Sequence, residues 1–217
     1  AGLKRVNISL DTLKPERFNR ITRGGSLDTV WKGIEAALEE GLQPVKLNCI
    51  AMKGFNDDEI LDFARLTVER PLHVRFIELM PIGESAGWAG ASRMPVEEVQ
   101  ATIASLGELQ PMGSDTGGGP AKYYTLPGAQ GTIGFISPMS RHFCHSCNRI
   151  RLTAEGKLRT CLHSRRELDL RNPVRQGASR EELALLMATE VSNKPLEHSM
   201  VEKGWADNVR VMSQIGG

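Results

Sequence analysis

The sequence predicts an α/β fold, a parallel sheet packed against helices, followed by a smaller α+β domain with a cysteine cluster. Three observations predict it. Short apolar strands alternate with amphipathic helices up to Gly107, short strands and glycine-rich turns follow, and three of the four cysteines lie close together in that second part. Successive βαβ units are right-handed and build a parallel sheet. The pattern leaves this sheet either open or closed toward a barrel.

The first strand and the helices after it are indicated by spacing and by capping residues. Residues 4–10 (KRVNISL) alternate apolar and polar side chains, which is typical of a strand. Pro15 can begin a short helix, and Ser26 can cap a longer helix that Gly41 ends. Residues 45–52 (VKLNCIAM) then form the next strand. This is one βα unit followed by the start of another.

Two further helices and one strand complete the first part. Asn56 and Glu59 have the spacing of a capping box, which predicts that a helix begins there. Residues 73–79 (HVRFIEL) form a third strand. Pro95 begins a helix with apolar residues on one face, and Gly107 ends it.

Several polar residues lie within or at the ends of these strands. A polar residue inside a buried parallel strand needs partners, so Lys46 and Arg75 are either satisfied in the interior or line a site. Barrel enzymes place their site residues at the carboxyl ends of strands. Cys49, a single thiol in mid-strand, is expected to pack. The residues that could line such a site are Ser9, Lys46, Asn48, Arg75, Glu78 and Met80.

The pattern changes after Gly107, so we place the domain boundary there, with residues 1–110 as a partial barrel and residues 111–217 as a C-terminal domain. Residues 114–121 (SDTGGGPA) lack the lysine and the following helix of a P-loop, which favours a connector. Ser179 and Glu182 can form a capping box. The expected elements are a hairpin around residues 123–135 and helices over 165–176 and 180–193.

Cys144, Cys147 and Cys161 form the pattern C-x2-C-x13-C. The two-residue gap lets a tight turn direct two thiolates at one point, and a third ligand can return from a following hairpin. The pattern therefore predicts a metal site. Buried apolar cysteines or a disulfide are the alternative.

Two kinds of metal site fit this spacing. With His142, His145 or His163 as fourth ligand, the site would be structural zinc. Without a fourth protein ligand, it would be a four-iron cluster with one open iron. Arg149 and Arg151 are two residues apart on an expected strand, so both would share a face beside the metal, where paired guanidiniums suit a polyphosphate. A solvated strand face is the alternative for the arginines.

Composition narrows the class of protein. The 27 basic and 26 acidic residues nearly balance, so no overall field draws the chain to nucleic acid or a membrane. No apolar run approaches the roughly 18 residues of a membrane span. The aromatic content of 5% argues against a platform for single-stranded nucleic acid. Cysteines in ligand spacing suit a reducing compartment, and we expect a cytoplasmic protein.

Several stretches resemble the GTP 3′,8-cyclases of molybdenum cofactor biosynthesis, and the match covers essentially the whole chain. Members are radical S-adenosylmethionine enzymes with an incomplete (β/α)6 barrel. In them a deoxyadenosyl radical abstracts a ribose hydrogen from GTP, and cyclic pyranopterin monophosphate synthase acts on the cyclised nucleotide. A homodimer is compatible with the resemblance. The matching stretches are VNISLDTL, VKLNCIAMKGFND, RFIELMP, GPAKYY, FCHSCNRIRLTAEGKLRTCL and the terminal Gly-Gly.

The resemblance also implies roles for individual residues. It implies that a second [4Fe-4S] cluster is held by Cys144, Cys147 and Cys161, with its open iron toward guanine. It implies GTP binding by Lys46, Arg149, Ile150 and Arg151. It implies that Ser9 and Met80 line the S-adenosylmethionine pocket, and that the tail ending in Gly216 and Gly217 reaches into the active site.

One departure from the family is large. The family's N-terminal C-x3-C-x2-C, which binds the radical-generating cluster, is not in these 217 residues, since no cysteine precedes Cys49. We therefore expect a C-terminal fragment that is inactive alone and lacks about the first third of a barrel. A zinc-stabilised module that binds a nucleotide or a protein without catalysis is the alternative function, and an interaction scaffold is a third.

Overall fold

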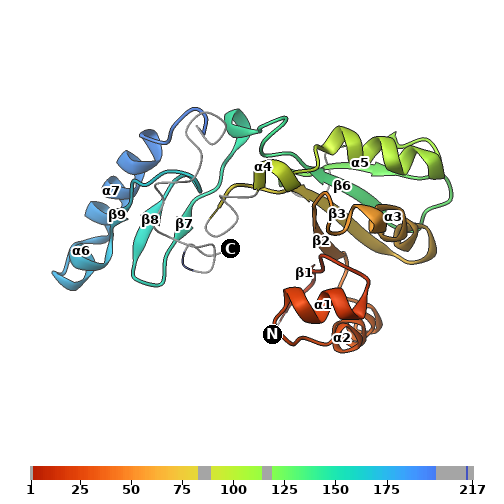
Figure 1. Ribbon diagram of the computed structural model, residues 1–217. Coiled ribbons are helices and arrows are strands. Elements are labelled where there is room, and N and C mark those ends of the chain that lie inside the picture. The colour runs from red at the N-terminus through yellow and green to blue at the C-terminus, as the bar shows by residue number, and fades with distance from the viewer. Residues whose placement is uncertain (1, 83–88, 114–118, 199–213, 215–217) are drawn as a thin grey trace. The chain divides into compact units, whose positions relative to one another are not determined.

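The computed structural model divides into two compact units, which are described separately (Figure 1). The first unit comprises residues 1–79 and 91–141, and the second comprises residues 80–90 and 142–217. No helix in the described part of the chain is long and apolar enough to cross a membrane. The residues described are 2–82, 89–113, 119–198 and 214.

The first unit is built on a six-stranded sheet with the order β1-β2-β3-β6-β5-β4. Strands β1, β2, β3 and β6 run parallel, whereas β5 pairs antiparallel with β6 and with β4. The predicted α/β fold with a parallel sheet is therefore confirmed. The strands are β1 Val6–Ser9, β2 Val45–Ala51, β3 Leu72–Glu78, β4 Gln110–Pro111, β5 Lys122–Thr125 and β6 Thr132–Ile136.

Helices connect the parallel strands close to the predicted positions. Ser26 caps α2 by accepting a hydrogen bond from the Thr29 amide at 3.4 Å, as expected. Pro15 begins α1, and Pro95 precedes α5. The helices are α1 Pro15–Ile21, α2 Leu27–Glu39, α3 Ile60–Glu69, α4 Ala89–Ser92 and α5 Val96–Ile103, with short 3-10 turns η1 Asp57–Glu59 and η3 Ala104–Leu106.

One face of the sheet carries the hydrophobic core. Helices α3 and α5 pack against β3 on this face (Figure 1). The Phe76 ring lies 6.3 Å from Phe63 of α3 and 6.1 Å from Phe135 of β6. Cys49 is fully buried in the same core, which confirms that it packs. Because side chains alternate along a strand, Lys46, Asn48 and Arg75 lie on the opposite face, whereas Glu78 shares the face of Phe76.

The predicted capping box at Asn56 and Glu59 is wrong, because both side chains have partners elsewhere. Asn56 Oδ1 accepts the Met52 amide at 2.8 Å, and Asn56 Nδ2 donates to the Asp11 carbonyl oxygen at 2.6 Å. Glu59 accepts hydrogen bonds from the Thr12 hydroxyl at 2.7 and 2.9 Å. A 3-10 turn precedes α3, and no side chain caps either element.

The second unit contains a small antiparallel sheet and two helices. The helix predicted over residues 165–176 is wrong in its first half, because Leu168 pairs with Leu158 in a strand and the helix begins only at Arg171. The predicted capping box of Ser179 and Glu182 is confirmed. The elements are η4 Cys144–Ser146, β7 Arg151–Leu152, β8 Lys157–Arg159, β9 Leu168–Asp169, α6 Arg171–Arg175 and α7 Arg180–Ser192.

The hairpin β5–β6 belongs to the sheet of the first unit. β6 pairs in parallel with β3 over the register from His73↔Thr132 to Ile77↔Ile136. The first compact unit therefore extends to Arg141, past residue 110. The division into domains at residue 110 stays a prediction. Most of the glycine-rich segment 114–121 lies outside the described residues.

Candidate functional site

The polar face of the first sheet brings together residues from four strands. Register pairs place Lys46 beside Asn7 and His73, and Arg75 beside Asn48. Side chains at paired positions of neighbouring parallel strands share one face. This polar face is formed at two levels of the sheet, one with Asn7, Lys46, His73 and Thr132, and the next with Ser9, Asn48, Arg75 and Gly134.

Arg75 is held in a fixed direction on the polar face. Its Nε donates to Asn48 Oδ1 at 2.7 Å, and its Nη2 donates to Asn7 Oδ1 at 2.8 Å. Gly134 leaves room for it, because a Cβ there would lie 3.0 Å from both Arg75 Cγ and a Tyr123 ring carbon. Two amide oxygens therefore orient Arg75, which stays partly exposed.

Lys46 adds a second positive charge to the polar face. It is 8% exposed, and its Nζ lies 5.4 Å from the centre of the Tyr123 ring. His73 Nδ1 is 2.6 Å from the Thr132 hydroxyl. Burial lowers the pKa of His73, and the charges of Lys46 and Arg75 lower it further, so the imidazole is neutral at pH 7. The face therefore suits an anionic group.

Glu78, at the carboxyl end of β3, is a buried carboxylate that joins three segments. It accepts hydrogen bonds from the amides of Val96 at 3.1 Å, Met139 at 2.9 Å and Ser140 at 2.9 Å, and from the Ser140 hydroxyl. These bonds fix the start of α5 and the residues that precede the cysteine motif. The sequence indicated Glu78 only by its position at a strand end.

The two residues predicted for the S-adenosylmethionine pocket belong to different units. Ser9 is exposed at the carboxyl end of β1 in the first unit. Met80 follows β3 and belongs to the second unit, where its carbonyl oxygen accepts the Ile82 amide at 2.8 Å. Their shared role stays a prediction.

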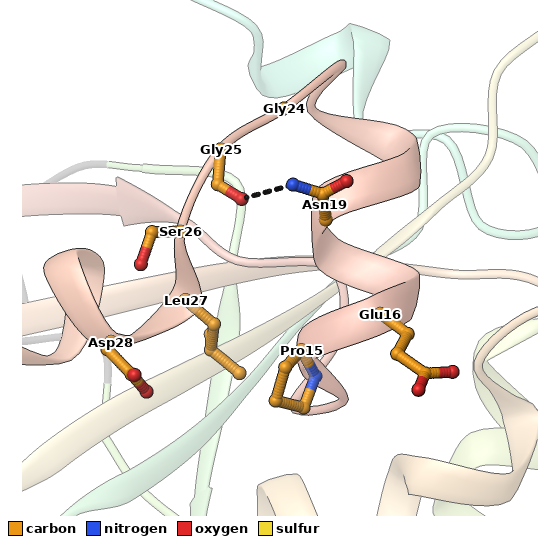
Figure 2. Close-up of a pocket in the computed structure, with 8 residues that line it drawn as sticks. All are labelled: Pro15, Glu16, Asn19, Gly24, Gly25, Ser26, Leu27 and Asp28. Carbon is orange, nitrogen blue, oxygen red and sulfur yellow. Dashed lines mark hydrogen bonds between the residues drawn. The ribbon is translucent and has the colours of Figure 1, made fainter.

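A separate pocket of about 500 Å³ lies between α1 and the start of α2. Figure 2 shows the Asn19 amide directed at the Gly25 carbonyl oxygen, a hydrogen bond of 3.2 Å that closes the turn between the helices. None of the predicted site residues lines it. The lining residues are Pro15, Glu16, Asn19, Gly24, Gly25, Ser26, Leu27 and Asp28.

The three cysteines of the second unit lie on a turn and after a hairpin, as the spacing predicts. Cys144 begins η4 and Cys147 directly follows it, and the Cys147 amide donates to the Cys144 carbonyl oxygen at 3.1 Å. Cys161 follows β8. All four cysteines of the chain are free, so the disulfide alternative is wrong. Within the described ranges, no three His, Cys, Asp or Glu side chains converge tightly enough to hold a metal ion.

The thiols nevertheless interact electrostatically. Burial raises the pKa of Cys144, and the charges of Cys161 and Cys147 raise it further. Burial also acts to raise the pKa of Cys147, but the Arg149 amide and the Lys194 ammonium outweigh it, so the pKa of Cys147 is lowered. The Lys194 ammonium therefore favours the thiolate form of Cys147, whereas burial disfavours the thiolate form of Cys144.

Arg149, Ile150 and Arg151 follow the cysteine turn directly. Only Arg151 lies in β7, so the expected strand is shorter than predicted. Burial lowers the pKa of Arg151 and the charge of Arg149 lowers it further, whereas Cys147 and Cys161 raise it. The structure thus brings the two guanidiniums near each other and Arg151 near the thiols. Gly216 and Gly217 lie outside the described residues.

Arg159, which sequence reasoning did not single out, fixes the loop after Cys161. It is 1% exposed. Its Nη2 donates to the carbonyl oxygens of Leu162 at 3.2 Å and Ser164 at 2.5 Å, and its Nη1 donates to Glu167 at 2.8 Å. The only signal in the sequence is an arginine two residues before a cysteine.

Comparisons with known proteins identify the family of the chain. The family model "Radical SAM superfamily" matches residues 1–67, and "Molybdenum Cofactor Synthesis C" matches residues 72–200. Three relatives, each called GTP 3′,8-cyclase, match the whole chain, from Heliobacterium modesticaldum at 58% identity, Pelotomaculum thermopropionicum at 56% and Moorella thermoacetica at 56%. The chain covers 67%, 66% and 66% of these proteins, about two thirds of their length.

The two family models together define the class, a radical S-adenosylmethionine protein with a molybdenum cofactor synthesis C-terminal domain. Within that class, the chain belongs to the GTP 3′,8-cyclase family. The resemblance that the sequence motifs indicated is confirmed. Membership of the superfamily implies S-adenosylmethionine and an iron–sulfur cluster as cofactors.

Proposed function

We propose that this chain acts in molybdenum cofactor biosynthesis by forming the GTP-binding part of a GTP 3′,8-cyclase. The observation that carries the proposal is the cysteine site, with three free thiols that interact with one another and with Lys194 and Arg151. The relatives' shared name supplies the reaction. The product would pass to cyclic pyranopterin monophosphate synthase.

The donor chemistry favours a four-iron cluster held by Cys144, Cys147 and Cys161. His142 is engaged with Glu197, at 3.7 Å, and with the His198 ring, at 5.6 Å. A cluster with three cysteine ligands supplies an open iron to which a purine can bind. Since the thiols do not yet converge, we expect the turn and the loop of Cys161 to close together when it binds.

The residues proposed to bind GTP are Arg149, Ile150, Arg151 and Lys46. The paired guanidiniums of Arg149 and Arg151 suit a triphosphate. Lys46, on the polar face, would supply a further positive charge. Ser9 and Met80 would contact S-adenosylmethionine, and Gly216-Gly217 would approach the substrate, because glycine permits close backbone approach.

Anaerobic reconstitution tests the cluster. With iron and sulfide, the chain should turn brown and bind about four irons. Cys147→Ala should lose most of this iron, whereas Cys49→Ala, in the core of the other unit, should keep it. A colourless protein that retains stoichiometric zinc would instead support the structural-zinc module.

Nucleotide binding tests the arginines. The double substitution Arg149→Ala and Arg151→Ala should weaken the binding of GTP at least about tenfold more than the binding of guanosine, because the lost contacts are charge-assisted bonds to phosphate. Calorimetry of both ligands measures this. Arg65→Ala, an exposed arginine on α3, serves as the control. Equal losses for GTP and guanosine would show that the pair recognises something other than phosphate.

A further inference from the structure

Lys194 follows α7, and its ammonium group makes three contacts with the cysteine turn. Its Nζ lies 2.5 Å from the Cys147 carbonyl oxygen, 3.0 Å from the Arg149 carbonyl oxygen and 3.4 Å from Cys147 Sγ. An ammonium group has three protons to donate, and these three acceptors match that number. The side chain is half-buried. The contact therefore has a defined direction.

These contacts combine a mechanical and an electrostatic effect. The two carbonyl bonds fix the backbone on both sides of Asn148, and thus the direction in which the Cys147 side chain leaves the turn. The third contact places the positively charged ammonium next to the Cys147 sulfur. Hydrogen bonds to ligand sulfurs and the net charge nearby set the reduction potential of iron–sulfur clusters.

We propose that Lys194 is a positioning residue of the cysteine site, which orients Cys147 and raises the reduction potential of the cluster that this site binds. The inference rests on the proposed function, since it requires a cluster at Cys147. Reduction adds negative charge to the cluster, and an adjacent ammonium stabilises the reduced form more than the oxidised form.

Arg159 shows how a purely structural clamp differs. It also binds two loop carbonyl oxygens, those of Leu162 and Ser164, beside the third cysteine. Among the described residues, Arg159 donates to these carbonyls and to Glu167, whereas Lys194 also donates to a sulfur. Loss of carbonyl bonds alone would loosen the turn without a systematic change in potential. The potential therefore separates the two roles.

The test uses the 217-residue chain, in which Cys144, Cys147 and Cys161 are the only clustered cysteines, so one potential is measured. Wild type, Lys194→Met, Lys194→Arg and the exposed control Lys53→Met are reconstituted anaerobically and titrated with dithionite under electron paramagnetic resonance. At the wild-type midpoint, the reduced-to-oxidised ratio of Lys194→Met should fall at least about tenfold. Lys194→Arg should restore most of it, and Lys53→Met should match wild type.

An unchanged ratio in Lys194→Met, with its cluster intact, would overturn the proposal. If Lys194→Met loses its cluster, Lys194→Gln decides, because it keeps two donors and removes the charge. A Lys194→Gln cluster with the wild-type ratio would overturn the electrostatic role, and a lowered ratio would support it. If Lys194→Gln also loses the cluster while Lys194→Arg holds it, the positioning role is supported and the claim about the reduction potential is withdrawn. A wild-type chain that binds no cluster would overturn the proposed function itself.

Discussion

Individual buried polar residues set the geometry at the carboxyl ends of the strands. Asp11 follows β1, and its Oδ1 accepts the Ile50 amide at 2.8 Å, which ties β1 to β2. Burial raises the pKa of Asp11, and the hydrogen bond from Ile50 only partly opposes this. The negative charge of Asp11 is therefore unfavourable at this position, whereas its oxygen is useful as a hydrogen-bond acceptor.

This predicts a pH dependence that Asp11→Asn removes. Because the folded-state pKa is raised above the ordinary value near 3.9, the folded state binds more protons, and stability falls as pH rises through the window between the two values. The slope is at most about 1.4 kcal/mol per pH unit. Asn keeps the acceptor oxygen, so its stability relative to wild type should rise with pH above about 4 and then level off.

Urea denaturation from pH 4 to pH 8 measures this difference. Asp28→Asn, at an exposed position of α2, should show no comparable trend. A difference between Asp11→Asn and wild type that is flat across this range would contradict the prediction.

Residue-level patterns predicted local contacts well and tertiary contacts poorly. Ser179 and Glu182 form their capping box because both are exposed and their nearest partners are each other's backbone amides. Asn56 and Glu59 have the same spacing, but they are buried and meet Met52 and Thr12 from neighbouring segments. Spacing alone cannot show this difference.

At the scale of elements, short strands in the second unit depend on pairing rather than on propensity. β9 has two residues and is defined by its pairing with β8, a contact that the helix predicted over residues 165–176 did not anticipate. The loop between these strands carries Cys161 and is held by Arg159. We therefore expect Arg159 to determine whether this loop keeps its shape.

Arg159→Met should destabilise the second unit by about 3 kcal/mol, because it leaves the Glu167 carboxylate without its closest cation and two partly buried carbonyl oxygens without the donors that Arg159 supplies. Arg159→Lys should recover only part of this, since an ammonium cannot reproduce the fork to Glu167 and the loop. Hydrogen exchange of the amides of residues 161–164 measures the loss. Arg65→Met is the control, and equal exchange in Arg159→Met and wild type would show that the loop is held by other contacts.

For the whole molecule, the sequence motifs were sufficient to predict the family, the α/β fold and the cysteine turn. The extent of the first unit was not predictable from them. β6 follows a hairpin and a glycine-rich segment, which indicated a new domain, yet it pairs in parallel with β3. Such a pairing between segments distant in the sequence leaves no periodic signal. The same holds for Lys194, far along the chain from the turn that it contacts.

A polypeptide of these 217 residues should not release 5′-deoxyadenosine from S-adenosylmethionine, even when its cysteine site is loaded with iron and sulfide. The radical-generating cluster needs three thiolates close in sequence, as the resemblance implies, and no cysteine precedes Cys49. Cys49 cannot replace them, because it is fully buried and burial raises its thiol pKa well above the ordinary range. Cys144, Cys147 and Cys161 lie in the other unit, next to the arginines assigned to phosphate.

The assay is mass-resolved chromatography after anaerobic incubation with dithionite, S-adenosylmethionine and GTP, with the full-length Heliobacterium relative in parallel as the positive control. Catalytic or stoichiometric 5′-deoxyadenosine from the 217-residue chain would mean that the three cysteines hold a radical-generating cluster, and the assignment of that site to GTP would have to be abandoned.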